Sequence, residues 1–120
     1  MERFESVSLR ESILSTSNAP YVPLPFDVVE WNLTKDNASI RTMSGIDRYV
    51  WEQEREKDSP IAYAVFLTLI LGDEHGNKLF SVNDAEKLAN KDWRIIDRLI
   101  TEGFKQNELT KKDDIEQSKK

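Results

Sequence analysis

Only a few residues in this sequence are of types that could carry out chemistry. His75 is the one histidine of the chain, and it stands beside two acidic residues, the first of which is Asp73. Imidazole and carboxylate groups could act together in acid–base catalysis or in metal binding. A calcium loop of the EF-hand type that began at Asp73 would need glycine at its sixth position and glutamate at its twelfth. Those positions hold Lys78 and Asp84, so we interpret residues 73–77 as a solvent-exposed turn.

No other residue pattern indicates a reactive site. The acidic side chains between residues 52 and 58 form a charged run, which is usually a solvated face. The four glycines have neither the spacing of a phosphate-binding loop nor that of a nucleophile elbow. The chain has no cysteine, which excludes disulfides and thiolate metal sites. We therefore expect no enzymatic activity, no cofactor and no metal.

The three tryptophans suggest binding to a partner rather than catalysis. Tryptophan is enriched among the residues that dominate the energy of protein interfaces, but it is also a large core residue. Trp93 falls on a predicted apolar helix face, and we interpret it as core. For Trp31 and Trp51 the sequence leaves core and surface open.

Composition limits the other classes of function. The formal net charge is −5 over 120 residues, which argues against nucleic-acid binding. The N-terminus has no apolar stretch behind a basic start, so we expect no secretory signal and a cytoplasmic location. The length is that of one small domain.

The elements that must position any functional residues are centred on the apolar run at residues 60–71. Ser59 and Pro60 are typical of a helix start, and Gly72 is typical of a left-handed residue at a helix end. A helix that is apolar on all sides needs neighbours on all sides. A buried strand over residues 65–71 is the alternative, and the run is too short to span a bilayer.

The rest of the chain predicts a mainly α fold with a small N-terminal β-hairpin (α+β), compact around the apolar helix. We expect a flexible N-terminal arm at residues 1–20 and one domain at residues 21–120. The hairpin is expected at about residues 24–43, with strands over 26–33 and 38–43. Helices are expected at about residues 45–56, 60–71, 82–89, 91–106 and 110–117.

Two of these helices begin with the serine and acidic residue of a capping box. The pairs are Ser44 with Asp47 and Ser81 with Asp84. In the first helix the predicted inner face holds Ile46, Tyr49 and Val50, with Trp51 toward its edge; in the second it holds Val82, Ala85, Leu88 and Ala89. The following helix has Trp93, Ile96, Leu99, Ile100 and Phe104 at helical spacing.

From Ile40 onward the order of features is similar to that of a known protein family. The motifs are Ile40-Arg41-Thr42-Met43-Ser44-Gly45-Ile46-Asp47-Arg48, the apolar run ending in Leu69-Ile70-Leu71, then Asp73-Glu74-His75-Gly76-Asn77-Lys78-Leu79-Phe80-Ser81, Asp84-Ala85-Glu86-Lys87-Leu88, the Asp97-Arg98-Leu99 helix and Leu109-Thr110-Lys111-Lys112-Asp113-Asp114. This order resembles the tail assembly chaperones of long-tailed bacteriophages. The resemblance covers the last two thirds of the chain, and the arm at residues 1–18 has no counterpart in it.

The resemblance implies a non-catalytic function. Chaperones of this family bind the tape measure protein and keep it soluble until the tail tube polymerises around it. They act in the host cytoplasm and are absent from the mature virion. The family also implies a longer, frameshifted form that recruits the tail tube protein.

Apolar surface is what such a protein would use, since helical partners bind in grooves through spaced apolar anchors. We expect some of this surface to meet the tape measure helix or a second copy of the chain. The predicted partner-binding residues are Trp31, Trp51, Leu79, Phe80, Trp93, Ile96, Ile100 and Phe104.

Two other functions remain open from the sequence. The first is a structural neck or head–tail completion protein, which would stay in the phage particle. The second is a small DNA-binding regulator with a helix-turn-helix over residues 81–104. The negative net charge argues against a DNA-binding regulator. The expected recognition helix would also offer few basic side chains to a DNA groove, namely Lys91, Arg94, Arg98 and Lys105.

Overall fold

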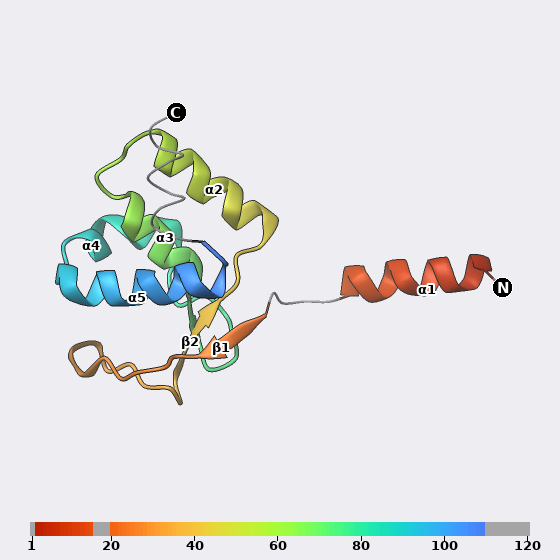
Figure 1. Cartoon of the computed structure of the whole chain (residues 1–120), viewed down its shortest axis with the longest axis horizontal. Helices are drawn as coiled ribbons and strands as arrows, with labels where there is room; N and C mark the ends of the chain where they lie inside the picture. The colour runs from red at the N-terminus through yellow and green to blue at the C-terminus, as the bar shows by residue number, and fades with distance from the viewer. Residues whose placement is uncertain (1, 16–19, 110–120) are drawn as a thin grey trace.

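The computed structural model describes residues 2–15 and 20–109, with side chains from residue 8 onward, and Figure 1 shows the arrangement of the elements. Their order is α1 (Glu2–Ser15), β1 (Tyr21–Pro23), the 3₁₀ turn η1 (Val29–Trp31), β2 (Ala38–Arg41), α2 (Gly45–Glu56), α3 (Ala62–Ile70), β3 (Leu71–Asp73), the 3₁₀ turn η2 (Val82–Asp84), α4 (Ala85–Ala89) and α5 (Trp93–Gln106). The predicted mixed α+β class is confirmed. The predicted helix at residues 110–117 lies outside the described residues.

The sheet has three antiparallel strands in the order β1-β2-β3. Val22 pairs with Ile40 on one side of β2, and Ile40 pairs with Leu71 on the other. The third strand follows α3 directly, so the apolar run supplies both a helix and a strand. The sequence prediction of a two-stranded hairpin did not include β3.

The first predicted strand is misplaced. Residues 26–33 were expected to form a β-strand, but they contain the 3₁₀ turn η1 and a single β-bridge, between Val28 and Leu33. Asn32 adopts a left-handed conformation with φ 56°, which turns the chain back so that Leu33 and Val28 exchange backbone hydrogen bonds of 3.0 and 2.9 Å. Val28 is buried, and this tight turn therefore replaces a strand. The partner of β2 is instead β1, at residues 21–23.

Helix α3 packs against α2, α4 and α5 (Figure 1). Its side chains from Ala64 to Ile70 are all 3% exposed or less. The helix has no polar face because its neighbours cover it on several sides. The one hydroxyl in this stretch, on Thr68, donates to the carbonyl of Val65 at 2.6 Å and so needs no outside partner.

Both ends of α3 differ from the prediction. The helix begins at Ala62, because the Ser59 hydroxyl accepts from the N–H of Ile61, two residues on, and makes a turn there. Gly72 is not a left-handed cap but an extended residue of β3. A Cβ at Gly72 would lie 2.7 Å from the hydroxyl oxygen of Ser39, so this glycine is needed for the close approach of β2.

Helix α2 covers the same residues as the predicted helix, and its Ser44–Asp47 capping box is confirmed. Its predicted inner face is only partly right, since Val50 packs against the core as expected but two other members do not. Ile46 and Tyr49 are 78% and 63% exposed, whereas Trp51 is buried. The rotation turns Asp47 inward, toward cationic groups of β2 and the chain after β3.

The segment before α5 also departs from a simple helical period. Val82 was predicted on the same inner face as Ala85 and Leu88, but it is exposed, because a 3₁₀ turn replaces the first turn of the predicted helix. Trp93 was predicted to be core and is 57% exposed. It is the first residue of α5, at the edge of the apolar face that Ile96 and later residues continue.

Residues 1–20 were predicted as a flexible arm, and within them the structure has helix α1, drawn apart from the other elements in Figure 1. Its large apolar side chains from residue 8 onward are exposed. The division into an arm and one domain at residues 21–120 stays a prediction.

Candidate partner-binding surface

The acidic residue Asp73, close to His75, stabilises a turn at residues 73–77. The Asp73 carboxylate accepts the backbone N–H groups of His75 and Asn77 at 2.8 and 3.0 Å. These bonds, that from Asn77 first, lower the pKa of Asp73. Gly76 completes the turn with φ 81°, a conformation that favours glycine. His75 is exposed, and the described residues contain no cluster of three or more metal-binding side chains.

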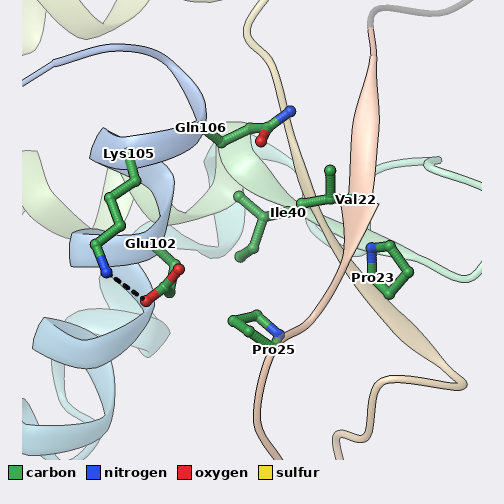
Figure 2. A pocket seen from close by; sticks show the side chains of 7 residues that line it. All are labelled: Val22, Pro23, Pro25, Ile40, Glu102, Lys105 and Gln106. Carbon is green, nitrogen blue, oxygen red and sulfur yellow. Dashed lines mark hydrogen bonds and ion pairs between the residues drawn. The ribbon is translucent and has the colours of Figure 1, made fainter.

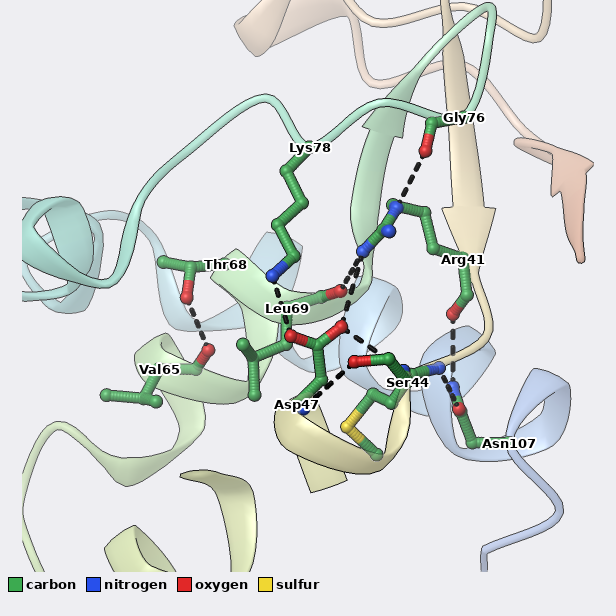
Figure 3. Close-up of polar contacts among 10 residues, drawn as sticks. Arg41, Ser44, Asp47, Val65, Thr68, Leu69, Gly76, Lys78 and Asn107 are labelled. Atoms are coloured by element: carbon green, nitrogen blue, oxygen red, sulfur yellow. Dashed lines mark hydrogen bonds and ion pairs between the residues drawn. The ribbon is translucent and has the colours of Figure 1, made fainter. Parts of the chain in front are cut away.

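A buried acid, Asp47, joins β2, the start of α2 and the chain after β3 (Figure 3). Its carboxylate accepts from Lys78 Nζ at 2.6 Å and lies 3.7 Å from an Arg41 guanidinium nitrogen. It also accepts the N–H of Ser44 at 3.2 Å, while the Ser44 hydroxyl accepts the N–H of Asp47. The Arg41 guanidinium donates in addition to the carbonyls of Gly76 and Leu69. We call Arg41, Ser44, Asp47 and Lys78 the Asp47 cluster.

The environment of Asp47 favours its charged form. Burial acts to raise the pKa of this carboxyl, but the hydrogen bonds from Lys78 and Ser44 and the lysine charge outweigh burial. The pKa of Asp47 is therefore below its ordinary value of 3.8. Both oxygens of the Asp47 carboxylate are occupied by contacts with Lys78, Arg41 and Ser44. We therefore interpret the Asp47 cluster as structural.

Two hollows in the described part of the chain have partly apolar linings. The first, which we call the Trp31 hollow, has a volume of about 300 Å³. Its lining residues are Glu30, Trp31, Leu33, Leu71, Phe80, Leu88 and Lys91. An apolar floor with one acidic and one basic residue suits a single large side chain of an amphipathic partner.

The second hollow lies between β1 and the last turns of α5, and we call it the β1–α5 groove (Figure 2). Its volume is about 180 Å³. The lining residues are Val22, Pro23, Pro25 and Ile40 on the side of the sheet and Glu102, Lys105 and Gln106 on α5. The Nζ of Lys105 lies 3.3 Å from a carboxylate oxygen of Glu102.

The structure divides the eight predicted partner-binding residues into two groups. Those available at the surface are Trp31, Leu79, Phe80 and Trp93, which are half-buried or exposed. Those within the core are Trp51, Ile96, Ile100 and Phe104, all 4% exposed or less. Among the first group, the Trp31 hollow brings Trp31 and Phe80 together. Their role in binding stays a prediction.

Trp93 is linked to the core by a chain of aromatic rings. Its ring centroid is 6.2 Å from that of Tyr63, which lies 6.0 Å from that of Trp51. Trp51 in turn packs on Phe66 at 4.8 Å. Tyr63 is 40% exposed, so Trp93 and Tyr63 form an aromatic pair at the surface, held by a buried ring beneath it.

Sequence reasoning missed Tyr63 and the whole β1–α5 groove. We assigned Tyr63 to the apolar run as a core residue. Its hydroxyl needs a hydrogen-bond partner or water, which favours a position near the surface. The groove joins residues about eighty positions apart, and no local pattern reports such a juxtaposition.

Comparison with known proteins identifies the fold. No family model matches the sequence, and no curated protein matches it. Among solved structures, the tail assembly chaperone of bacteriophage HK97 aligns with a TM-score of 0.59 and 18% sequence identity. The alignment covers 82% of this chain and 93% of that chain.

The chain has the fold of a phage tail assembly chaperone. The resemblance inferred from the sequence is thus confirmed. The match extends over nearly all of the HK97 chaperone and most of this chain, so the two share a fold. In this fold the Asp47 carboxylate is buried, and the Trp31 hollow, the β1–α5 groove and the Trp93–Tyr63 pair are among the apolar features at the surface.

No helix within the described ranges is long and apolar enough to cross a membrane.

Proposed function

We propose that this chain is a tail assembly chaperone that binds the tape measure protein and keeps it soluble while the tail tube polymerises. The observation that carries the proposal is the fold shared with the HK97 tail assembly chaperone across 93% of that chain. The proposed action is binding without catalysis. Its site is the host cytoplasm, and the protein is not retained in the mature virion.

The surface supports this proposal physically. A long helical client exposes apolar stripes, and it is bound through single anchor side chains that enter apolar hollows. The Trp31 hollow offers two half-buried aromatic residues and three aliphatic ones. Glu30 and Lys91, which also line it, could pair with polar residues that flank the anchor side chain on the client. The net charge of −5 keeps a complex that carries much apolar surface in solution.

The proposal extends to two further partners. A longer form, made by a translational frameshift, would recruit the tail tube protein. Self-association of the chain would let several copies cover one long client.

Co-expression tests the main proposal. A tape measure protein from the same genome is produced with and without this chain, and its soluble fraction is measured. We expect the soluble fraction to rise and both proteins to co-purify. A tape measure protein that stays insoluble, or that never co-purifies, would contradict the proposal.

A variant pair tests the Trp31 hollow. Trp31→Ala removes an aromatic wall and is expected to reduce capture about tenfold or more, the usual range for a tryptophan anchor. Val29→Ala, in the same 3₁₀ turn but outside the hollow, should leave capture unchanged. Thermal unfolding of both variants checks that each is folded.

Mass spectrometry of purified virions distinguishes the alternative, a neck or head–tail completion protein. A structural protein would be found in the particle at fixed stoichiometry. We expect the chain to be absent from it.

A further inference from the structure

A third hollow adjoins the Trp31 hollow and differs from it in chemistry. We call it the arginine hollow; its volume is about 300 Å³, and its lining residues are Glu30, Asp92, Arg94, Ile95 and Arg98. Glu30 lines both hollows, and Lys91 of the Trp31 hollow directly precedes Asp92 of the arginine hollow. A partner side chain seated against Trp31 would therefore have neighbours beside the two arginines.

Arg94 is already engaged by acidic residues of this chain. Its Nη2 donates to a carboxylate oxygen of Asp92 at 2.9 Å, and its backbone N–H donates to the other oxygen at 2.9 Å. The side-chain hydrogen bond and the charge of Asp92, followed by the charge of Glu30, raise the pKa of Arg94. Both acidic residues of the arginine hollow thus act on Arg94.

Arg98 is held by an aromatic ring instead of an acid. Its guanidinium carbon Cζ lies 4.4 Å from the centroid of the Phe26 ring. Phe26 is half-buried and packs against the core, so the ring is a firm support. Arg98 itself is exposed, and no hydrogen bond or ion pair joins its guanidinium to another residue of the described part of the chain.

Such a guanidinium is prepared to bind a carboxylate. The ring covers one face of the planar group, and the N–H donors point outward from its edge, where a carboxylate can accept two parallel hydrogen bonds. Because the ring restricts the side chain, less conformational freedom is lost on binding. Acidic residues outnumber Lys and Arg by 22 to 17 in this chain, yet none of the described ones pairs with Arg98. A carboxylate from a partner suits this position.

An amphipathic helix can present an apolar anchor and a carboxylate together. Residues three or four positions apart are neighbours on a helix surface, with about 5 to 6 Å between their Cβ atoms. An anchor in the Trp31 hollow can thus bring an acidic residue of the adjacent helical turn to the arginine hollow beside it.

We propose that Arg98 selects the client segments that this chain binds, namely helices in which an aspartate or glutamate stands three or four positions from the apolar anchor. The carboxylate binds the Arg98 guanidinium while the anchor occupies the Trp31 hollow. This inference rests on the proposed function, because its client is a helix of the tape measure protein.

Overlapping segments of a tape measure protein from the same genome test the selection. Each segment carries a fluorescent label, and its dissociation constant is measured with the natural chain and with Arg98→Gln. We expect the bound segments to have the anchor and the acid at the proposed spacing. Arg98→Gln should weaken their binding about tenfold or more, as for a lost hydrogen bond between charged groups. Equal binding by Arg98→Gln would overturn the proposal.

Arg48→Gln is the matched control. It removes the same charge from α2, outside both hollows, and should leave binding unchanged. An equal loss with Arg48→Gln would show an effect of net charge alone and would also overturn selection by Arg98.

An exchange of charges tests for direct contact. Replacing the acid of a bound segment with lysine should weaken its binding to the natural chain about tenfold or more, and Arg98→Glu should restore binding of that altered segment. A chain that fails to fold cannot produce this recovery. If Arg98→Glu unfolds at the natural temperature and gives no recovery, the contact is overturned.

The outcomes distinguish this inference from the proposed function. Capture of the tape measure protein that does not depend on Arg98 would overturn the selection and leave the chaperone role standing. Failure to capture either the whole tape measure protein or any of its segments would overturn both.

Discussion

At the residue scale, the fold depends on one acid that the sequence marks only as a helix cap. Asp47 occupies the third position of α2, where a capping box needs an acid, and its side chain is 7% exposed. The same carboxylate binds Lys78, 31 positions away, and lies beside Arg41. Removing its charge would leave the largely buried Arg41 and the partly exposed Lys78 facing a neutral partner.

We therefore expect Asp47→Asn to lower the free energy of unfolding by about 2 kcal/mol, as for a partly buried ion pair that loses one member. Asp84→Asn is the matched control, because Asp84 accepts the N–H of Ser81 in a more accessible helix start. Its cost should stay below about 1 kcal/mol. Urea unfolding of both variants measures the two values, and equal costs would contradict the role of burial.

The same carboxyl gives a pH dependence of defined sign. A group whose pKa is lower in the folded state stabilises the fold above its unfolded pKa and loses that effect as pH falls through the folded pKa. For Asp47 the loss should begin near 3.8 and continue below it. The difference in unfolding free energy between the natural chain and Asp47→Asn should thus be constant near neutral pH and shrink below about pH 4. A difference that grows in acid would contradict the assigned direction.

The tryptophans make a second residue-scale contrast. Trp51 is 1% exposed and Trp93 is 57% exposed. Trp51→Ala should cost about 3 to 5 kcal/mol, and Trp93→Ala about 1 kcal/mol or less. Thermal and urea unfolding test both values. A larger cost for Trp93 would place it in the core, as the helical pattern had suggested.

At the element scale, the packing of α5 on α3 depends on a glycine inside a helix. A Cβ on Gly103 would lie 2.9 Å from a ring carbon of Phe66 and 3.0 Å from Ile70. Both neighbours are fully buried, so neither can move aside without disturbing the core. Close approach of the two helices, and not backbone flexibility, explains this glycine.

Gly103→Ala should consequently destabilise the chain by about 1 to 3 kcal/mol, although alanine is the better helix former. Gly45→Ala is the control, because a Cβ there meets nothing within 4 Å at the start of α2. That substitution should be neutral or stabilise by up to about 1 kcal/mol. Denaturant midpoints measure both effects, and the two changes should have opposite signs or differ clearly in size.

At the scale of the whole molecule, one core joins the helices and the sheet, and α1 stands outside it. The core includes Leu24 beside β1, Leu71 of β3 and Phe104 of α5. Residues 8–15 of α1 contribute no buried side chain to it. Stability is therefore expected to reside in the domain that follows α1.

Removing residues 1–17 should change the free energy of unfolding by less than about 0.5 kcal/mol at a concentration where the chain is monomeric. Leu24→Ala, which empties a fully buried position, should cost about 2 to 5 kcal/mol in the same assay. Circular dichroism during urea titration measures both. A large loss on removing the arm would show that α1 packs on its own domain.

The sequence by itself determined the features that depend on neighbours along the chain. Capping residues, turn residues and the 3.6-residue period identified α2, α5 and the turn at Asp73, and the order of these motifs indicated the fold that the HK97 chaperone shares. The lack of cysteine also follows from sequence alone.

Only the tertiary structure decided which faces are buried and which segments pair. Trp51 rather than Tyr49 faces inward because Asp47 has to reach Lys78 and Arg41. Strand β3 exists because the end of the apolar run can pair with β2, and Val22 meets the end of α5 only once the sheet packs on that helix. Such contacts join distant residues, and packing and charge pairing in three dimensions fix them, so local patterns cannot report them.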